Sequence, residues 1–148
     1  MVGEVTMDIG RGINLCSKLI KNKMNKELED YKITSVQFSV LKFIEMHNDE
    51  PGFNTAANIS QMLDMDKPTI SAVINRLIEK DYIEKRPHPT DGRAWVLSLT
   101  DRYKENSTLM EQKSEEVINL AVCGLNEEEV KYFNKTLHKI IGNLKDFH

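Results

Sequence analysis

Six polar or small residues near the middle of the chain lie opposite an apolar stripe and could bind nucleic acid bases. They are Lys67, Thr69, Ser71, Ala72, Asn75 and Arg76. Asn and Arg side chains can form paired hydrogen bonds with base edges, and Ser and Thr hydroxyls can bind bases or phosphates. Small side chains would let a helix lie deep in a major groove. The ordinary alternative is a solvated helix face, because every surface helix has a polar side.

A second candidate is the turn-rich segment of residues 87–93, which contains two prolines and an Asp-Gly pair. Asp91 could hold the guanidinium of Arg93 so that it points to a phosphate or into a narrow minor groove. His88 is a candidate contact at the tip of the same segment, or an exposed residue without a role. For Asp91 and Arg93, a simple surface ion pair is the alternative.

Two consecutive helices with a short turn between them are predicted to position the first set. The first would span residues 56–63 with Thr55 as its N-cap, and Asp64 tolerates the left-handed conformation that ends helices. Asp66 can cap the second helix, and Pro68 falls in its first turn, where a missing N–H costs little. The apolar stripe of the second helix must face a core and consists of Ile70, Val73, Ile74, Leu77 and Ile78.

The residues on either side of this pair complete the pattern. Asn54 and Thr55 lie where the first helix begins, so their N–H groups and side chains could hold a phosphate, although a cap explains Thr55 equally well. Residues 82–86 and 94–99 are strand-like runs that flank the turn-rich segment and predict a hairpin. Residues 54–100 therefore predict a helix-turn-helix followed by a wing.

Several short motifs follow one another along the chain with characteristic spacing. They are Ile33-Thr34-x-x-Gln37, Thr55-Ala56-x-x-Ile59, Thr69-Ile70-Ser71, Asn75-Arg76-Leu77, Ile83-Glu84-Lys85-Arg86, Asp91-Gly92-Arg93-Ala94 and Leu99-Thr100. In order and spacing the chain resembles, over nearly its whole length, the MarR (multiple antibiotic resistance regulator) family of winged helix-turn-helix transcriptional regulators. Asn58 and Asp81 depart from the Glu and Gly that are usual in the family.

The resemblance implies that the second helix enters a major groove while Arg93 reaches the adjacent minor groove or backbone. It also places Arg76 and Asp91 in the DNA-facing set. The complete set of predicted DNA-binding residues is Asn54, Thr55, Lys67, Pro68, Thr69, Ser71, Ala72, Asn75, Arg76, His88, Asp91 and Arg93.

The net charge of the whole chain argues against DNA binding, whereas the local charge of the winged segment favours it. The net charge of the 148-residue chain is −3, which argues against a general polyanion-binding protein. Between Lys67 and Arg93, however, six Lys and Arg residues stand against four Asp and Glu residues. Because the local field decides binding, a modest local excess predicts salt-sensitive affinity with a substantial share from base contacts and shape.

Other functions lack their sequence signals. No apolar run approaches the roughly 18 residues of a membrane span, and the N-terminus lacks the apolar stretch of a signal peptide, so a cytoplasmic protein is expected. Two distant cysteines and four scattered histidines match no metal-binding spacing. There is no Gly-rich phosphate loop and no G-x-S-x-G motif. We therefore predict no enzyme, no catalytic residues, no metal and no cofactor.

Helical patterns also flank the winged segment. The periodicity predicts helices over residues 7–31, 35–47 and 101–123 and from Glu127 onward, with Thr34, Thr100 and Asn126 as N-caps. Gln37 would complete a capping box with Thr34. The fold class is mainly α with a small β-hairpin wing. The predicted division is an N-terminal helix (1–33), a winged helix-turn-helix domain (34–99), and a connecting helix with a C-terminal helix (100–148).

The first and last helices have apolar stripes but no partner sheet. A second copy of the chain is the economical partner, so we expect a homodimer with its two recognition helices about 34 Å apart, which is one DNA turn. A self-contained monomeric bundle is the alternative. Cys16 lies on the first apolar stripe, where a small core side chain is its ordinary role.

The predicted function is a sequence-specific double-stranded DNA-binding regulator, a repressor of a near-palindromic operator. Because the family commonly responds to small ligands, a small-molecule effector is expected to release it. Two alternatives are a winged-helix interaction or dimerisation module without DNA binding, and an oxidant-sensing regulator that acts through Cys16. The polar side of the second helix and Arg93 favour DNA binding, whereas the acidic net charge favours the interaction module.

Overall fold

The computed structural model describes the backbone of residues 2–146 and the side chains of residues 8–146. Within that part of the chain, α-helices and one antiparallel hairpin make up the fold, which confirms the predicted fold class. The elements are α1 (Val2–Glu27), the 3-10 turn η1 (Glu29–Tyr31), α2 (Ser35–Met46), α3 (Ala56–Met62), α4 (Lys67–Glu79), β1 (Ile83–Pro87), β2 (Trp95–Leu99), α5 (Asp101–Ala121) and α6 (Glu127–Lys145).

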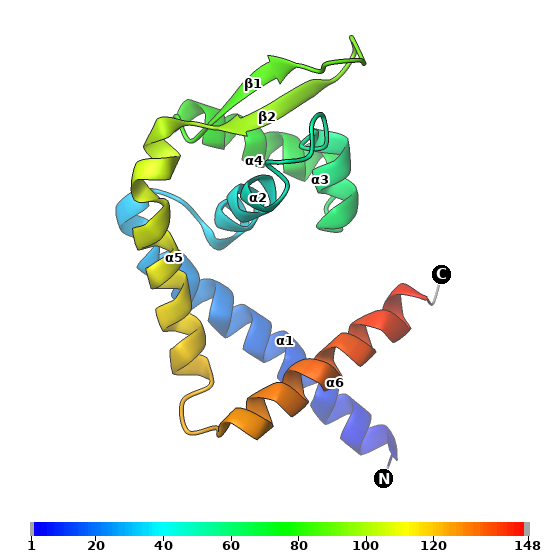
Figure 1. Ribbon diagram of the computed structural model, residues 1–148. Coiled ribbons are helices and arrows are strands. Elements are labelled where there is room, and N and C mark those ends of the chain that lie inside the picture. The colour runs from blue at the N-terminus through cyan, green and yellow to red at the C-terminus, as the bar shows by residue number, and fades with distance from the viewer. Residues whose placement is uncertain (1, 147–148) are drawn as a thin grey trace.

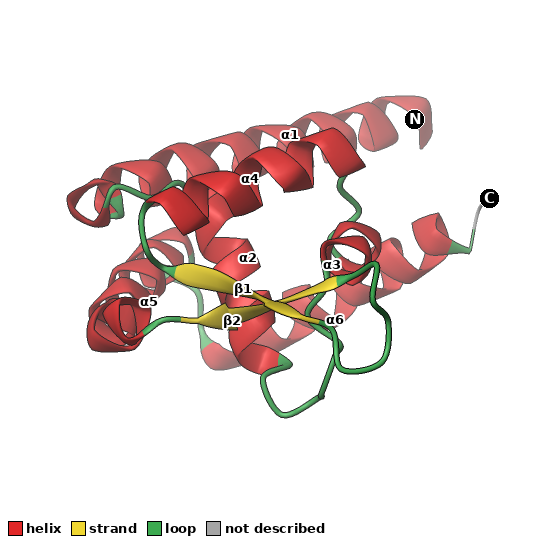
Figure 2. Cartoon of the chain, turned by 90° about the horizontal axis from the view of Figure 1, so that it is seen from above, coloured by secondary structure: helices red, strands yellow, loops and turns green. Residues whose placement is uncertain are grey.

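Helices α2, α3 and α4 and the hairpin form one lobe, from which α1, α5 and α6 extend (Figure 1). Helix α5 leaves the end of β2 and lies beside α1, and α6 then crosses α1 away from the lobe (Figure 1). Seen from above, β1 lies beside α4 while β2 lies over α2 and next to α3 (Figure 2). The hairpin therefore projects from the same side of the lobe as α3 and α4.

Side-chain caps begin the helices of the lobe at the predicted residues. The Thr34 hydroxyl accepts the Gln37 N–H at 3.2 Å, and the Gln37 side chain accepts the Thr34 N–H at 3.1 Å, which completes the predicted capping box. Thr55 and Asp66 accept N–H groups of the first turns of α3 and α4 at 3.2 and 2.7 Å. These short-range hydrogen bonds explain why the helices begin where the sequence predicts.

Left-handed residues end three of the elements. Asp64, with φ of 52°, follows α3 as predicted, and Asp81, with φ of 60°, follows α4. Asp81 thus adopts the conformation that the glycine usual in the family would adopt more readily. The first helix differs from the prediction, because it begins at Val2 and ends at Glu27 before η1 and the left-handed Lys32.

Replacing Thr34 with alanine should lower the free energy of unfolding by about 1 kcal/mol, because the first turn of α2 loses the hydroxyl that accepts the Gln37 N–H. Thr108 lies exposed within α5 and makes no cap, so Thr108→Ala is the matched control and should change stability little. Urea unfolding of the three proteins measures the difference. Equal midpoints for wild type and Thr34→Ala would contradict the role of the cap.

The hydrophobic core extends beyond the winged segment. Its buried members come from α2, α3, α4 and both strands, but also from the end of α1 and from α5: Leu28, Ile33, Phe38, Val40, Leu41, Phe43, Ile44, Ile59, Ile70, Ile74, Leu77, Tyr82, Ile83, Leu97, Tyr103 and Met110. The division at residues 33 and 99 stays a prediction, but the core crosses both boundaries. The lobe and the two long helices that leave it therefore pack as one body.

Tyrosine side chains attach the lobe to its flanking helices. The Tyr82 hydroxyl donates to the Tyr31 carbonyl at 2.8 Å, and the buried Tyr103 of α5 donates to the Glu45 carboxylate of α2. Burial, and then the hydrogen bond to Glu45, raise the pKa of Tyr103 well above the usual value. Tyr103 therefore stays neutral and orients α5 against the lobe.

Helices α1 and α6 expose much apolar surface. Within the described part of the chain, α6 has no buried residue. The large apolar side chains exposed on the two helices are Ile9, Ile13, Leu15, Leu19, Tyr132, Phe133, Ile141 and Leu144. No helix within residues 2–146 combines the length and apolarity needed to cross a membrane. Apolar surface of this extent is typical of an interface with another protein molecule.

An apolar groove of about 440 Å³ lies where α6 crosses α1. It is lined by Asp8, Ile9, Gly12, Ile13, Cys16, Phe133, Thr136, Leu137 and Ile140. Cys16 is exposed in this groove, contrary to the expected core position. The groove between α1 and α6 is open to solvent, so Cys16 lines it without becoming buried.

Candidate nucleic-acid interface

Helix α4 has one buried side and one exposed side. Ile70, Ile74 and Leu77 lie in the core. The seven predicted DNA-binding residues of this helix are all exposed: Lys67, Pro68, Thr69, Ser71, Ala72, Asn75 and Arg76. Because the apolar stripe fixes the rotation of the helix, the polar side can meet a partner without any rearrangement.

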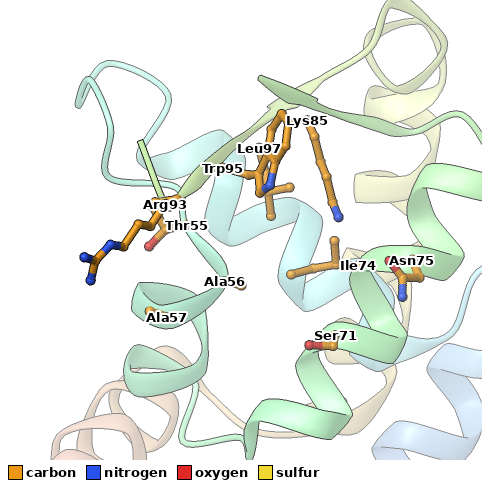
Figure 3. A pocket seen from close by; sticks show the side chains of 11 residues that line it. Thr55, Ala56, Ala57, Ser71, Ile74, Asn75, Lys85, Arg93, Trp95 and Leu97 are labelled. Carbon is orange, nitrogen blue, oxygen red and sulfur yellow. The ribbon is translucent and has the colours of Figure 1, made fainter. Parts of the chain in front are cut away.

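The polar side of α4, the start of α3 and the hairpin enclose a groove of about 400 Å³. We call it the recognition groove, and it is lined by Thr55, Ala56, Ala57, Ser71, Ile74, Asn75, Lys85, Arg93, Ala94, Trp95 and Leu97. Figure 3 shows Ser71 and Asn75 along α4, with Lys85 extending from the hairpin toward that helix. Residues far apart in sequence therefore face one shared space.

The wing residues Asp91 and Arg93 are linked in a different way from the one predicted. The Asp91 carboxylate accepts the main-chain N–H of Arg93 at 3.0 Å, rather than its guanidinium. Asp commonly binds the backbone two residues later, because that N–H is the nearest donor in a turn. The Arg93 side chain is exposed and points away from α4 (Figure 3). Asp91 thus shapes the turn and leaves the guanidinium available.

Asn54 lies inside the protein, contrary to the prediction that it contacts DNA. It is 4% exposed, and its side-chain amide donates to the Ile44 carbonyl at 3.0 Å. Its own carbonyl accepts the Leu97 N–H at 2.8 Å. Asn54 therefore links α2 to β2 and helps to fix the position of β2, which contributes residues to the recognition groove. The following Thr55 caps α3 and also lines the groove, so both of its predicted roles remain possible.

His88 is also turned toward the protein. Its Nε2 lies 3.2 Å from the Gly52 carbonyl, in the connection between α2 and α3. Its Nδ1 accepts the N–H groups of Thr90 and Asp91 at 3.1 and 3.0 Å. Because both ring nitrogens are engaged within the protein, the ring is not placed as the predicted DNA contact.

Several cations of α4 and of the wing are available to a partner. Among the ion pairs between described residues, none includes Lys67, Arg76, Lys85 or Arg93. Arg86, on the other side of the hairpin, pairs with Glu84 at 2.6 Å. The positive charge that is free to attract phosphates therefore lies on α4 and on the wing.

Two groups at the ends of α4 have shifted pKa values. Hydrogen bonds from the Thr69 side chain and main chain lower the pKa of Asp66 below its usual value, so this N-cap stays ionised. Burial, and then repulsion by Arg76, lower the pKa of Lys80. Lys80 donates to the Lys32 carbonyl and to the Gln37 side chain, so it serves the packing of α4 on α2.

Residues 31–94, which span most of the winged lobe, match the model of the MarR family. The fold agrees over nearly the whole chain with a MarR protein from Peptoclostridium difficile, with a TM-score of 0.84 and 25% identity, covering 94% of this chain and 88% of that one. Residues 31–94 of this chain thus match the MarR family, and the fold around them is that of a MarR protein. The resemblance found in its motifs is therefore confirmed.

Relatives of this chain are named as transcriptional regulators. It is 28% identical to the regulator MgrA of Staphylococcus aureus over 79% of this chain and 76% of MgrA. It is 24% identical to the uncharacterised regulator YybA of Bacillus subtilis, over 93% and 89% of the two chains. The family is one of regulators, which confirms that the chain is not an enzyme. In the described residues, no three His, Cys, Asp or Glu side chains could hold a metal ion.

Among the groove residues missing from the predicted set are a lysine and a tryptophan of the hairpin, Lys85 and Trp95. Lys85 and Trp95 lie on the same face of the hairpin as the core residue Leu97: Lys85 is paired with Leu97 across the strands, and Trp95 lies nearer the tip. Trp95 is 53% exposed there. The alternation of strand residues could have revealed them, since a lysine at an inward position of a strand must face something polar.

Proposed function

We propose that this regulator binds double-stranded DNA sequence-specifically, with α4 in the major groove and the wing against the adjacent minor groove or backbone. One observation supports this most directly. The exposed polar side of α4 and the cations of the wing line one groove, which a DNA backbone could enter. A major groove about 12 Å wide admits a helix of this kind. Binding to DNA would place the protein in the cytoplasm.

The proposed binding form is a homodimer. Helices α1 and α6 expose large apolar side chains on the described surface, and α6 buries none of its residues within the chain. A second copy could cover these side chains through a two-fold interface. Two copies of α4 about 34 Å apart would then face successive major grooves, so the operator would be a near-palindrome.

A DNA complex of a similar fold makes DNA the first partner to test. The MepR regulator of Staphylococcus aureus, solved with DNA, has a TM-score of 0.82 to this chain, covering 92% of this chain and 97% of MepR at 23% identity. That likeness concerns the fold. The proposal for this chain rests on its own groove and charges.

We also propose that the regulator is a repressor that a small molecule releases. A ligand that binds better to a dimer whose α4 helices are wrongly spaced for DNA would shift the population and lower operator affinity. Leu28, Phe43 and Tyr103, which lie between lobe and flanking helices, are buried in the core. They would therefore act as packing residues that couple a movement of the flanking helices to the position of the lobe and its α4.

Selection from random duplexes by the purified protein tests the proposal. We expect a near-palindromic consensus with two half-sites about one turn apart, and an affinity that falls with salt. A protein that retains DNA weakly, without consensus and only at low salt, would instead support the interaction module, which the net charge of −3 favours.

Replacing Asn75 with alanine should relax base preference at one position of each half-site by about 1–3 kcal/mol, because a paired hydrogen bond to a base edge is lost. Binding to unrelated duplexes should stay unchanged. Ser71→Ala should relax a neighbouring position in the same way. Repeating the selection with each variant measures the preference, and an unchanged consensus from both variants would contradict the placement of α4.

An oxidant response through Cys16 is a second candidate. Cys16 is exposed and lines the groove between α1 and α6, where the proposed dimer forms. Oxidation would add a polar group to an apolar interface and oppose its assembly. Peroxide should then weaken operator binding by the wild type and leave Cys16→Ser unaffected. Equal sensitivity of both proteins would exclude this role.

A further inference from the structure

We propose that His88 is a positioning residue that holds the wing for DNA binding only while its imidazole is neutral. Acidification would then release the wing and weaken binding. The inference rests on the proposed DNA-binding function and adds a proton-dependent control to it. Its starting point is a ring that sequence alone would assign to the DNA surface but that contacts the protein at both nitrogens.

The contacts of the ring require one protonation state. Nδ1 accepts two main-chain N–H groups, from Thr90 at 3.1 Å and from Asp91 at 3.0 Å. An accepting nitrogen has no proton, so the single proton of the neutral ring lies on Nε2. There it can be donated to the Gly52 carbonyl, which is 3.2 Å away. The neutral ring with its proton on Nε2 is therefore the form that satisfies all three contacts.

The ring packs against a connection that is itself held in place. Gly52 has a φ of +76°, and a Cβ atom added there would lie 2.7 Å from His88 Nε2, so the close approach depends on glycine. The next residue, Phe53, stacks on Phe43 of α2 with 6.0 Å between ring centroids. His88 thus fastens the tip of the wing to a segment that is anchored on the core.

The same contacts reach the wing arginine through the backbone. The N–H of Asp91 is bound by His88, and the carboxylate of Asp91 accepts the N–H of Arg93 at 3.0 Å. The turn that presents Arg93 is therefore defined from His88 onward. Loss of the His88 contacts would leave Arg93 charged and exposed but free to move, so each phosphate contact would cost additional ordering entropy.

Protonation removes the accepting nitrogen. In the charged ring both nitrogens bear hydrogen, so Nδ1–H would face the N–H groups of Thr90 and Asp91. The other titratable and charged groups on the segments around the ring are Asp91 and Arg93 on the wing, His47 at the end of α2, and Asp49 and Glu50 on the connection. An added positive charge on the ring would by itself strengthen the attraction to DNA, so affinity would rise on acidification. Release of the wing would make affinity fall instead, so the direction of the change distinguishes the two effects.

Operator affinity measured between about pH 8 and pH 5, the range in which histidines change charge, tests the inference. The wild type should lose about fivefold to tenfold on acidification, as expected for the loss of a few hydrogen bonds. His88→Asn, which can reach the turn but not Gly52, and His88→Gln, which can reach Gly52 but not both turn amides, should bind more weakly at pH 8 and lose the acid response.

Two other histidines provide matched controls. His47→Gln removes the neighbouring titratable ring, and His138→Gln removes an exposed ring on α6. Both should keep the acid response of the wild type. A wild type whose affinity is constant or rises on acidification, or an acid response that persists in both His88 variants, would overturn the inference. Absence of wild-type binding at pH 8 would instead overturn the proposed function itself.

Nitrogen NMR of the protein without DNA tests the contacts independently. At pH 8 we expect an unprotonated Nδ1 in His88, with the amide signals of Thr90 and Asp91 following the titration of the ring. These amide shifts should be absent in His88→Gln. A ring with its proton on Nδ1, or amide signals that do not respond, would overturn the positioning role whatever the DNA measurements show.

Discussion

Replacing Phe133 with aspartate should convert the protein from dimer to monomer and lower its affinity for the operator by about 10²–10⁴-fold, because the two half-sites are then bound separately. Phe133 is 60% exposed in the single chain and lines the groove between α1 and α6. A carboxylate at that position would have to lose its hydration in the proposed interface without a partner. The isolated chain should still fold, since the residue lies outside the core of the lobe.

Sedimentation equilibrium, together with binding to one and to two half-sites, measures this change. Lys135→Asp is the matched control, because it adds a carboxylate to α6 about half a helical turn from Phe133, on the opposite side. The control should remain dimeric. A Phe133→Asp protein that stays dimeric with full affinity would show that the dimer uses another surface. A wild type that is monomeric would support the self-contained bundle.

Replacing Arg93 with alanine should weaken binding to every DNA sequence by about 1.5–3 kcal/mol per protomer, the contribution of a hydrogen bond to a charged group. The slope of log affinity against log salt should fall by about one for each arginine removed, because one phosphate contact is lost. Arg93 makes no ion pair within the described structure and points away from α4, so its removal leaves no unpaired carboxylate. The loss would therefore report on DNA rather than on stability.

Arg86→Ala is the control for this measurement. Arg86 lies on the same hairpin, but it pairs with Glu84 at 2.6 Å and does not line the recognition groove. Its removal should change affinity and salt dependence much less. Arg93→Lys should keep most of the salt slope while losing part of the affinity, since lysine keeps the charge but not the planar donor pair. Equal losses from Arg86→Ala and Arg93→Ala would indicate only a general effect of charge.

The elements of the winged lobe could be predicted because local interactions specify them. Thr34, Thr55 and Asp66 cap their helices through N–H groups three residues away, and the stripe on α4 decides which of its sides is buried. The hairpin follows from two strand-like runs around a turn. Each of these signals depends on residues that are neighbours in the chain, so no knowledge of the tertiary structure was needed.

The errors concern residues whose neighbours are distant in the chain. Asn54 was assigned to DNA because it precedes a helix, but it binds the Ile44 carbonyl and the β2 backbone. His88 was assigned to the surface because the wing tip is polar, but its ring contacts Gly52, 36 residues away. Lys85 was not assigned at all, although it lines the recognition groove.

The sequence by itself determined the MarR-family fold class, the winged helix-turn-helix and the exposed polar side of α4, because periodicity, caps and turn residues act over a few positions. Only the tertiary structure decided which polar groups remain available to a partner. The outcome depends on where the main-chain groups of Gly52, Ile44 and Leu97 lie after folding, because polar groups inside a protein form hydrogen bonds with partners that folding brings near. Folding therefore buried Asn54 and engaged both ring nitrogens of the half-buried His88 within the protein.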